Sequence, residues 1–141
     1  MIKFNYYDKD KFLIIKYSGI IDKPTLVSFM DFIFLRTDKI SLEKVLNDFR
    51  NASIAFDLRD LPDILKLRVN YSEGFKNSLL AVYLVQEVKE TVFTTLYAKE
   101  VPPNISKVKI CSTIEFAIKL LGLSMTPEEL ESKINNLVSE F

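Results

Sequence analysis

Five charged residues flank the end of the third β-strand that the sequence predicts: Asp48, Arg50, Asp57, Arg59 and Asp60. Open α/β sheets usually bind their ligands at the carboxyl ends of the strands. Paired carboxylates at such a place can hold a metal ion or a polar ligand, and arginines can bind an anion through two parallel hydrogen bonds. The alternative is structural: the aspartates cap a helix and the arginines form local ion pairs. We treat the five residues as a candidate ligand- or partner-binding cluster.

The sequence has no histidine and one cysteine, Cys111. This composition excludes Ser-His-Asp and Cys-His catalysis, histidine metal sites and zinc sites built from several thiolates. Its three glycines fall at the ends of predicted elements, so they cannot form a glycine-rich phosphate loop. An enzyme would have to use carboxylates and arginines, with Asp48, Asp57 and Asp60 as candidates. We expect a non-enzymatic protein without a metal or cofactor, and keep the carboxylate enzyme as an alternative.

A helix predicted from Asp22 to about Arg36 has more apolar residues than one buried face requires. Val27, Phe32 and Leu35 belong to this surplus. One interpretation is a surface for a protein partner or a homodimer, because exposed apolar patches mark interaction sites. The other is that a neighbouring helix, such as the last one in the chain, covers these side chains.

Aromatic side chains are abundant, with eleven Phe, six Tyr and no Trp. They could line a pocket for a small apolar, lipid-like ligand under the helices, or they could simply fill the core. The aromatic residues considered for such a pocket are Phe29, Phe32, Phe34, Phe75, Tyr83, Phe93, Tyr97 and Phe116.

Charge and hydropathy narrow the classes of partner. The 19 basic and 19 acidic side chains balance, and no segment is strongly basic. A nucleic-acid backbone or an anionic membrane surface is therefore not the expected partner. No uncharged apolar run approaches the roughly 20 residues of a membrane span. With a single cysteine and no apolar leader at the N-terminus, the cytoplasm is the expected location.

Alternating strand and helix patterns position these residues. Strands are predicted over 2–7 and 12–17 as an opening hairpin, then over 44–49 with an irregular continuation over 51–56, and over 79–85 and 107–111. Helices are predicted over 22–36, 60–71, 87–99, 112–121 and 126–140. The side chains expected to face inward from 87–99 are Val88, Val92, Phe93, Leu96 and Tyr97, and those from the last helix are Leu130, Ile134, Leu137 and Val138. The pattern indicates one α/β domain over 1–141, with a core over 1–122 and the last helix as an extension.

The order and spacing of four segments resemble the STAS-like, or SpoIIAA-like, domains of bacterial anti-sigma-factor antagonists. The segments are the hairpin end at 17–19, the strand at 45–50, the apolar strand at 80–85 and the strand-to-helix junction at 108–117. The resemblance implies a mixed five-stranded sheet with helices packed on it. It also implies a non-enzymatic bacterial module that binds a protein partner or, in some relatives, an apolar ligand.

One feature of the resembling family is absent from its usual place. True antagonists switch through a phosphorylatable serine at the start of the helix after the third strand. Here that stretch, 55–60, has no serine or threonine, and Ser53 lies earlier, within an apolar run. An aspartate such as Asp57 can mimic the charge of a phosphoserine but cannot be switched. The sequence therefore predicts the fold of the family without its phosphorylation switch.

Overall fold

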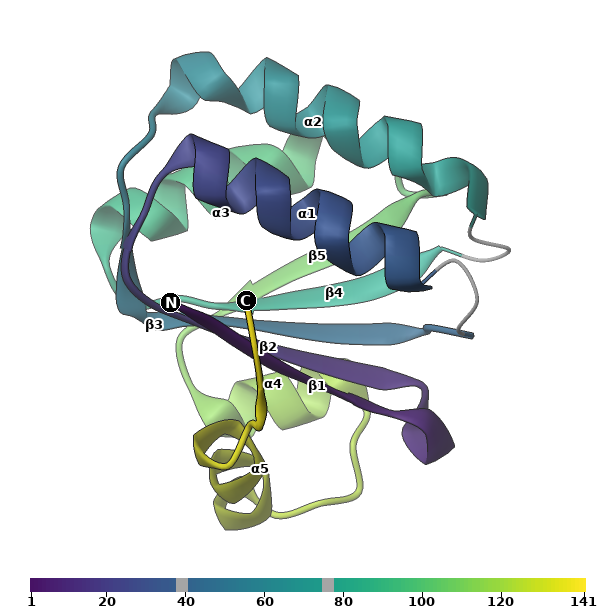
Figure 1. Ribbon diagram of the computed structural model, residues 1–141. Coiled ribbons are helices and arrows are strands. Elements are labelled where there is room, and N and C mark those ends of the chain that lie inside the picture. The colour runs from purple at the N-terminus through teal and green to yellow at the C-terminus, as the bar shows by residue number, and fades with distance from the viewer. Residues whose placement is uncertain (38–40, 75–77) are drawn as a thin grey trace.

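The computed structural model describes residues 1–37, 41–74 and 78–141. These residues form one six-stranded mixed sheet in the order β5-β4-β3-β2-β1-β6, with helices on both faces (Figure 1). The strands are β1 (Ile2–Tyr7), β2 (Phe12–Ile21), β3 (Lys44–Ile54), β4 (Leu79–Leu84), β5 (Ser106–Cys111) and β6 (Ser139–Glu140). The helices are α1 (Lys23–Thr37), α2 (Leu61–Asn70), α3 (Val88–Glu100), α4 (Ile114–Leu121) and α5 (Pro127–Asn135). The predicted α/β class is confirmed, but the prediction of five strands is wrong.

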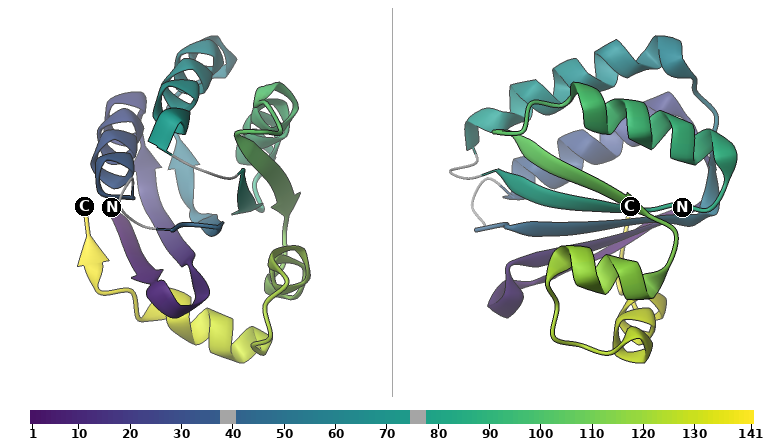
Figure 2. Two further views of the ribbon diagram at one scale, coloured as in Figure 1. Left: turned by 90° about the vertical axis from the view of Figure 1, so that its right-hand side faces the viewer. Right: turned by 180° about the vertical axis from the view of Figure 1, so that it is seen from behind.

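The first two strands form the predicted hairpin, in which β1 pairs antiparallel with β2. Strands β2, β3, β4 and β5 are parallel to one another. Helices α1, α2 and α3 make the crossovers between these strands and cover one face of the sheet, while α4 and α5 cover the other (Figures 1 and 2). The sheet therefore separates two hydrophobic cores, of which the one beneath α1–α3 is the larger.

Capping residues mark the predicted N-terminal ends of α1 and α5. The Asp22 carboxylate accepts a hydrogen bond of 2.8 Å from the backbone N–H of Thr25, and Pro24 follows in the first turn of α1. A capping box between Thr126 and Glu129 begins α5. Among the described residues, no helix is long and apolar enough to cross a membrane.

A bulge in β3 decides which way its side chains point. Lys16 of β2 pairs with Asp48, but Ser18 pairs with Asn51, so β3 has one extra residue between these pairs. Before the bulge, Asn47 and Phe49 face the core beneath α1–α3, whereas Asp48 and Arg50 face α5; after it the alternation is shifted by one residue, so Ala52 and Ile54 face that core. The irregular continuation predicted over 51–56 is thus the end of one bulged strand that runs to Ile54.

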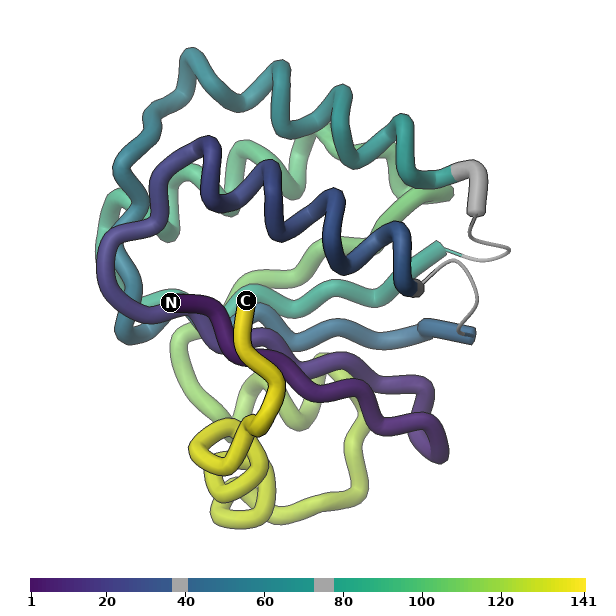
Figure 3. The backbone as a smooth tube through the Cα atoms, viewed as in Figure 1, coloured from purple at the N-terminus to yellow at the C-terminus, as the bar shows by residue number. Residues whose placement is uncertain are grey.

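The C-terminal segment differs from the prediction. The helix expected over 126–140 ends at Asn135, and β6 then pairs antiparallel with β1, next to the N-terminus (Figure 3). Leu130 and Ile134 of α5 are fully buried against the α4 side of the sheet, so this helix packs on its own chain. Val138, which was expected to face inward, is 82% exposed because it lies beyond the helix, just before the edge strand.

Candidate functional site

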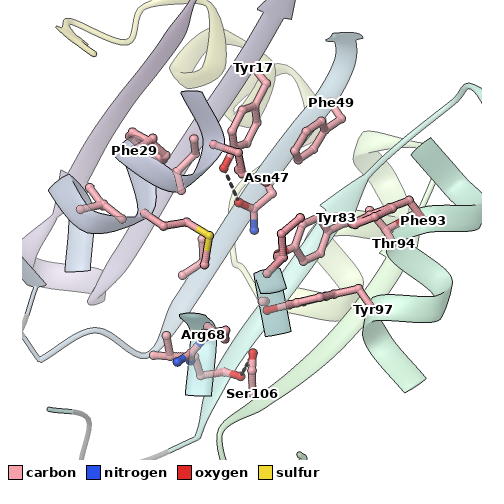
Figure 4. Close-up of a pocket in the computed structure, with 18 of the residues that line it drawn as sticks. Tyr17, Phe29, Asn47, Phe49, Arg68, Tyr83, Phe93, Thr94, Tyr97 and Ser106 are labelled. Carbon is pink, nitrogen blue, oxygen red and sulfur yellow. Dashed lines mark hydrogen bonds between the residues drawn. The ribbon is translucent and has the colours of Figure 1, made fainter. Parts of the chain in front are cut away.

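A cavity of about 110 Å³ lies between the sheet and the three helices of its upper face (Figure 4). Strands β2, β3 and β4 form its floor, and α1, α2 and α3 form its roof. Most of the side chains around it are apolar, including Leu13, Ile15, Leu26, Ile33, Val45 and Ala81. The sequence folds this way because alternate residues of the buried strands point to the same face.

Aromatic rings make up much of the cavity wall. Tyr17 stacks on Phe49 with ring centroids 4.0 Å apart, and Phe49 lies 6.1 Å from Tyr83. Tyr83 meets Tyr97 of α3 edge to face at 6.0 Å. Deeper toward the carboxyl ends of the strands, Phe93 continues this wall. The rings therefore form a continuous surface from β2 across the sheet to α3, suited to an apolar or aromatic ligand.

The cavity also contains polar groups at its centre. The hydroxyl of Tyr17 donates a hydrogen bond of 3.3 Å to Oδ1 of Asn47. Asn47 pairs in the β3–β4 register with Tyr83, whose hydroxyl lies beside that of Tyr97. Burial raises the pKa of all three tyrosines, so their hydroxyls stay protonated at neutral pH. The centre of the cavity is thus lined by neutral hydrogen-bonding groups.

Two charged residues line the cavity at opposite ends of the strands. Arg68 of α2 lies where β4 and β5 begin, and its Nη2 donates to the carbonyl of Ile105 at 3.2 Å. Desolvation lowers the pKa of Arg68 from its usual value. Glu90 of α3 lies where β3 ends, and its Oε1 accepts from the backbone N–H of Ile54 at 2.8 Å. Both side chains tie a helix to the sheet and so hold the cavity open between them.

The aromatic residues considered from the sequence are divided by the structure. Phe29, Phe34, Tyr83, Phe93 and Tyr97 line the cavity. Phe32 packs instead against Phe4 and Phe141, and Phe116 is exposed on α4 on the other side of the sheet. Phe75 lies outside the described residues.

The candidate charged cluster is separated into two groups. Asp48 is 1% exposed, and the Arg50 guanidinium binds it through two hydrogen bonds of 3.0 and 2.8 Å. The same guanidinium reaches both carboxylate oxygens of Glu131 on α5 at 3.1 Å. These contacts raise the pKa of Arg50, with the hydrogen bond to Asp48 as the largest cause. This group joins β3 to α5 and borders an open hollow that also includes Gln86.

The second group lies at the start of α2, on the cavity side of the sheet. Asp57 and Asp60 form a reciprocal capping box around the short 3-10 turn (Leu58–Asp60) that leads into α2, and Arg59 pairs with Asp57 at 2.7 Å. The Arg59 hydrogen bonds lower the pKa of Asp57 to about 2. Lys23 of α1 binds Asp60 at 3.1 Å and so links the two helix starts. Among the described residues, no three His, Cys, Asp or Glu side chains are grouped so as to hold a metal ion.

The three apolar residues of the expected partner surface have different surroundings. Leu35 is 67% exposed, and Val27 is half-buried. Phe32 contacts Phe141, whose ring lies 5.1 Å away, so the end of the chain covers part of this face of α1. The covering element is the segment around β6, not the last helix.

Sequence reasoning missed several cavity residues, among them Tyr17, Asn47, Arg68 and Glu90. Tyr17 follows Leu13 and Ile15 at every second position of β2, and Asn47 lies between Val45 and Phe49 on one face of β3, and that register was a signal that both face the core. Arg68 and Glu90 are charged residues on helices and read as exposed positions, because charged groups are seldom buried without partners. On α3 the buried face accordingly contains Glu90, Phe93, Thr94 and Tyr97, whereas Val88 and Val92, expected inside, are exposed.

No protein-family model matches this chain, and no curated protein sequence matches it. Among solved structures it is similar to an uncharacterized protein of the DUF3478 family with a SpoIIAA-like fold, from Shewanella loihica PV-4. The TM-score is 0.57 at 17% sequence identity, and the alignment covers 86% of this chain and 92% of that chain. The chain therefore has a SpoIIAA-like fold, as the resemblance of its sequence implied.

Proposed function

We propose that this protein binds a small apolar molecule in the cavity beneath α1–α3 and acts as its carrier or receptor. The observation that supports the proposal best is the cavity itself, with apolar and aromatic walls and a few polar groups at its centre. Ligand sites generally combine an apolar lining with a small number of convergent polar groups. The central pair of Tyr17 and Asn47 supplies such groups.

The size of the cavity suggests the size of the ligand. Apolar cavities of about 150 Å³ bind a single benzene ring. The cavity here is smaller, about 110 Å³, but it is partly open, so it can take a short chain, or one aromatic ring that extends toward the opening. If left empty, a cavity of this size would cost the folded state about 2 to 3 kcal/mol, at roughly 24 cal/mol per Å³. A ligand that fills it would recover part of that free energy.

The proposed role is non-enzymatic. The carboxylates considered for catalysis are engaged in local contacts: Asp48 with Arg50, Asp57 with Arg59, and Asp60 with Lys23. These contacts support a structural role for the three aspartates. A carrier needs no reacting group, so the proposal does not depend on a metal or a cofactor.

Filling the cavity tests the proposal. Ala81 lies on its floor in β4, so Ala81→Leu would occupy space that a ligand needs. We expect this substitution to weaken binding of acetophenone, a single-ring probe, by about tenfold or more. The free energy of unfolding of the ligand-free protein should stay equal or rise by about 1 kcal/mol, because the new methyl groups fill empty space. Native mass spectrometry, calorimetry and denaturant unfolding measure these quantities.

Ala98→Leu is the matched control, because Ala98 is a half-exposed residue of α3 that does not line the cavity. It should leave binding unchanged. Purified wild-type protein that carries no small molecule and binds no single-ring or short-chain probe would contradict the carrier role. Equal loss of binding in both variants would also count against the cavity as the site.

A protein-binding module of a bacterial cytoplasm is the second candidate function. It is supported by the SpoIIAA-like fold and by Leu35, a large apolar side chain on α1 that is mostly exposed. Exposed apolar side chains of this kind contribute to interfaces. On this proposal the module works without a phosphorylation switch, because the turn that leads into α2 is capped by Asp57 and Asp60 and has no serine. A homodimer through α1 is the simplest form of the idea.

A further inference from the structure

The amide of Asn47 is an unusual group to find in the middle of an apolar cavity. The residue lies in β3 between Leu46 and Asp48, is 5% exposed, and lines the cavity. Its only hydrogen bond within the described part of the chain is the one that Oδ1 accepts from Tyr17. Nδ2 therefore has no acceptor among the described residues. The nitrogen faces the open space of the cavity, so an acceptor from outside the chain can reach it and replace the water that would otherwise take that hydrogen bond.

Tyr17 fixes the orientation of this amide. The tyrosine ring is held between Phe49, on which it stacks at 4.0 Å, and Phe29, which it meets edge to face at 6.1 Å. Burial raises the pKa of Tyr17, so its hydroxyl keeps its proton and can donate to Oδ1. Figure 4 shows the consequence: the Asn47 nitrogen is turned away from Tyr17, into the space bounded by Tyr83.

The surroundings of the amide nitrogen are neutral. Tyr17, Phe49 and Tyr83 are its labelled neighbours in the cavity, and Tyr83 is its partner in the β3–β4 register. Arg68 and Glu90 lie toward the two ends of the strands, where they contact the backbone at Ile105 and Ile54. Arg68 and Glu90 carry opposite charges, so the cavity offers an ionised ligand no net counter-charge, and such a ligand would lose its hydration there. A neutral acceptor would lose much less hydration free energy on entering the cavity.

We propose that Asn47 is the specificity-determining residue of the cavity, and that its amide selects a small apolar ligand with one uncharged acceptor oxygen, such as a ketone or ester carbonyl. This inference rests on the carrier role proposed above and names the class of molecule that is carried. Tyr17 acts through Asn47 as a positioning residue. The carbonyl oxygen accepts from Nδ2, and the apolar part of the ligand lies against the aromatic wall.

A pair of probes with the same shape isolates this hydrogen bond. Acetophenone and α-methylstyrene differ only by a carbonyl oxygen in place of a methylene group, so both test the cavity and only acetophenone tests the amide. α-Methylstyrene is the more hydrophobic probe and gains more free energy on burial. In the wild-type protein we expect the hydrogen bond from Asn47 to make up part of that difference for acetophenone. In Asn47→Leu, the dissociation constant of acetophenone divided by that of α-methylstyrene should rise about tenfold. Calorimetry or competition against a fluorescent probe gives both constants.

Thr94→Val is the matched control, because Thr94 also lines the cavity but its hydroxyl already donates to the Glu90 carbonyl at 2.8 Å. It should leave the ratio unchanged. If both probes bind and Asn47→Leu leaves the ratio unchanged, the role of Asn47 is overturned while the carrier role stands. If neither probe nor any other small apolar molecule binds the wild type, the carrier role itself fails. If the negatively charged benzoate bound more tightly than acetophenone, the proposal that the ligand is uncharged would be overturned.

A measurement on the wild-type protein keeps the inference testable if Asn47→Leu does not fold. The carbonyl stretching frequency of bound acetophenone should fall below its value in cyclohexane, because a hydrogen bond weakens the C=O bond. A frequency equal to that in cyclohexane would show that no donor contacts the oxygen, and would overturn the proposal.

Discussion

Arg50 neutralises a carboxylate that would otherwise be buried without a counter-charge. Asp48 is fully buried on the α5 side of β3, and its ion pair with Arg50 has an N–O distance of 2.8 Å. Arg50→Met would keep much of the apolar stem but leave the Asp48 charge with the backbone N–H of residue 50 as its remaining donor. We expect a loss of about 3 kcal/mol in the free energy of unfolding, because breaking a buried ion pair strands one charge. Urea unfolding measures it.

Glu131→Gln is the control for this prediction. Glu131 binds the same guanidinium, but its side chain is 40% exposed, and water screens its charge. Its replacement should cost less than about 1 kcal/mol. If the two substitutions were equally costly, Arg50 would serve to attach α5 and not to neutralise Asp48.

At the scale of single residues, the sequence predicted which side chains were charged and near the end of β3, but not how they divide. Alternation along β3 places Asp48 on one face of the sheet, while the chain beyond β3 carries Asp57 to the other. Closeness in the sequence alone grouped these residues together, although one lies within a strand and the other follows it. Asn47 was missed for a related reason: a polar residue in a strand is normally assigned to the wet face.

At the scale of elements, β6 is a two-residue strand that fastens the C-terminus to the sheet. It carries Phe141 to α1, where the ring lies 5.3 Å from Phe29 and 5.1 Å from Phe32. Phe141→Ala should lower the free energy of unfolding by about 1 to 2 kcal/mol, less than for a fully buried Phe because the ring is partly exposed. Thermal or urea unfolding measures the change.

Val138→Ala tests whether the effect belongs to the ring contacts. Val138 lies in the same segment but is almost fully exposed, so its truncation should change the free energy of unfolding by less than about 0.5 kcal/mol. Similar losses in both variants would mean that the segment as a whole, and not the Phe141 ring, stabilises α1.

The elements that the sequence predicted well are those with a clear period and a terminal signal. Helix α1 begins at its Asp22 cap, and β4 is buried on both faces as its continuous apolar run indicated. Helix α3 was placed well, but its buried face was rotated, because Glu90 and Thr94 are buried while Val88 and Val92 are not. Strand β6 is too short for alternation to be detected, so the sheet was expected to have one strand fewer.

At the scale of the whole molecule, the order of strands and helices was enough to predict the SpoIIAA-like fold. The cavity could not be predicted in the same way. Its volume depends on how closely α1, α2 and α3 approach the sheet, and the same aromatic residues could equally have filled that space. The sequence therefore favoured a protein-binding module, with the carrier as the alternative, and the structure adds a physical reason to test the carrier first.

The association state decides whether α1 is also an interface. Phe32→Asp is not a suitable test, because a carboxylate there would be placed among Phe4, Phe29 and Phe141 and would destabilise the fold. Leu35→Asp avoids this problem, since Leu35 is 67% exposed in the single chain. If α1 forms a homodimer, Leu35→Asp should raise its dissociation constant roughly tenfold or more, because the new charge would be buried in the interface.

Light scattering over a range of protein concentrations measures that constant, and circular dichroism checks that the fold is kept. Val88→Asp on α3 is the matched control: it introduces the same charge at a residue that is 79% exposed on a different helix, and should leave the mass unchanged. If the wild-type protein is a monomer at every concentration tested, the homodimer proposal is contradicted. If the dimer has the same dissociation constant in Leu35→Asp, its interface lies elsewhere on the molecule. The exposed face of α1 would then have no support as an interface.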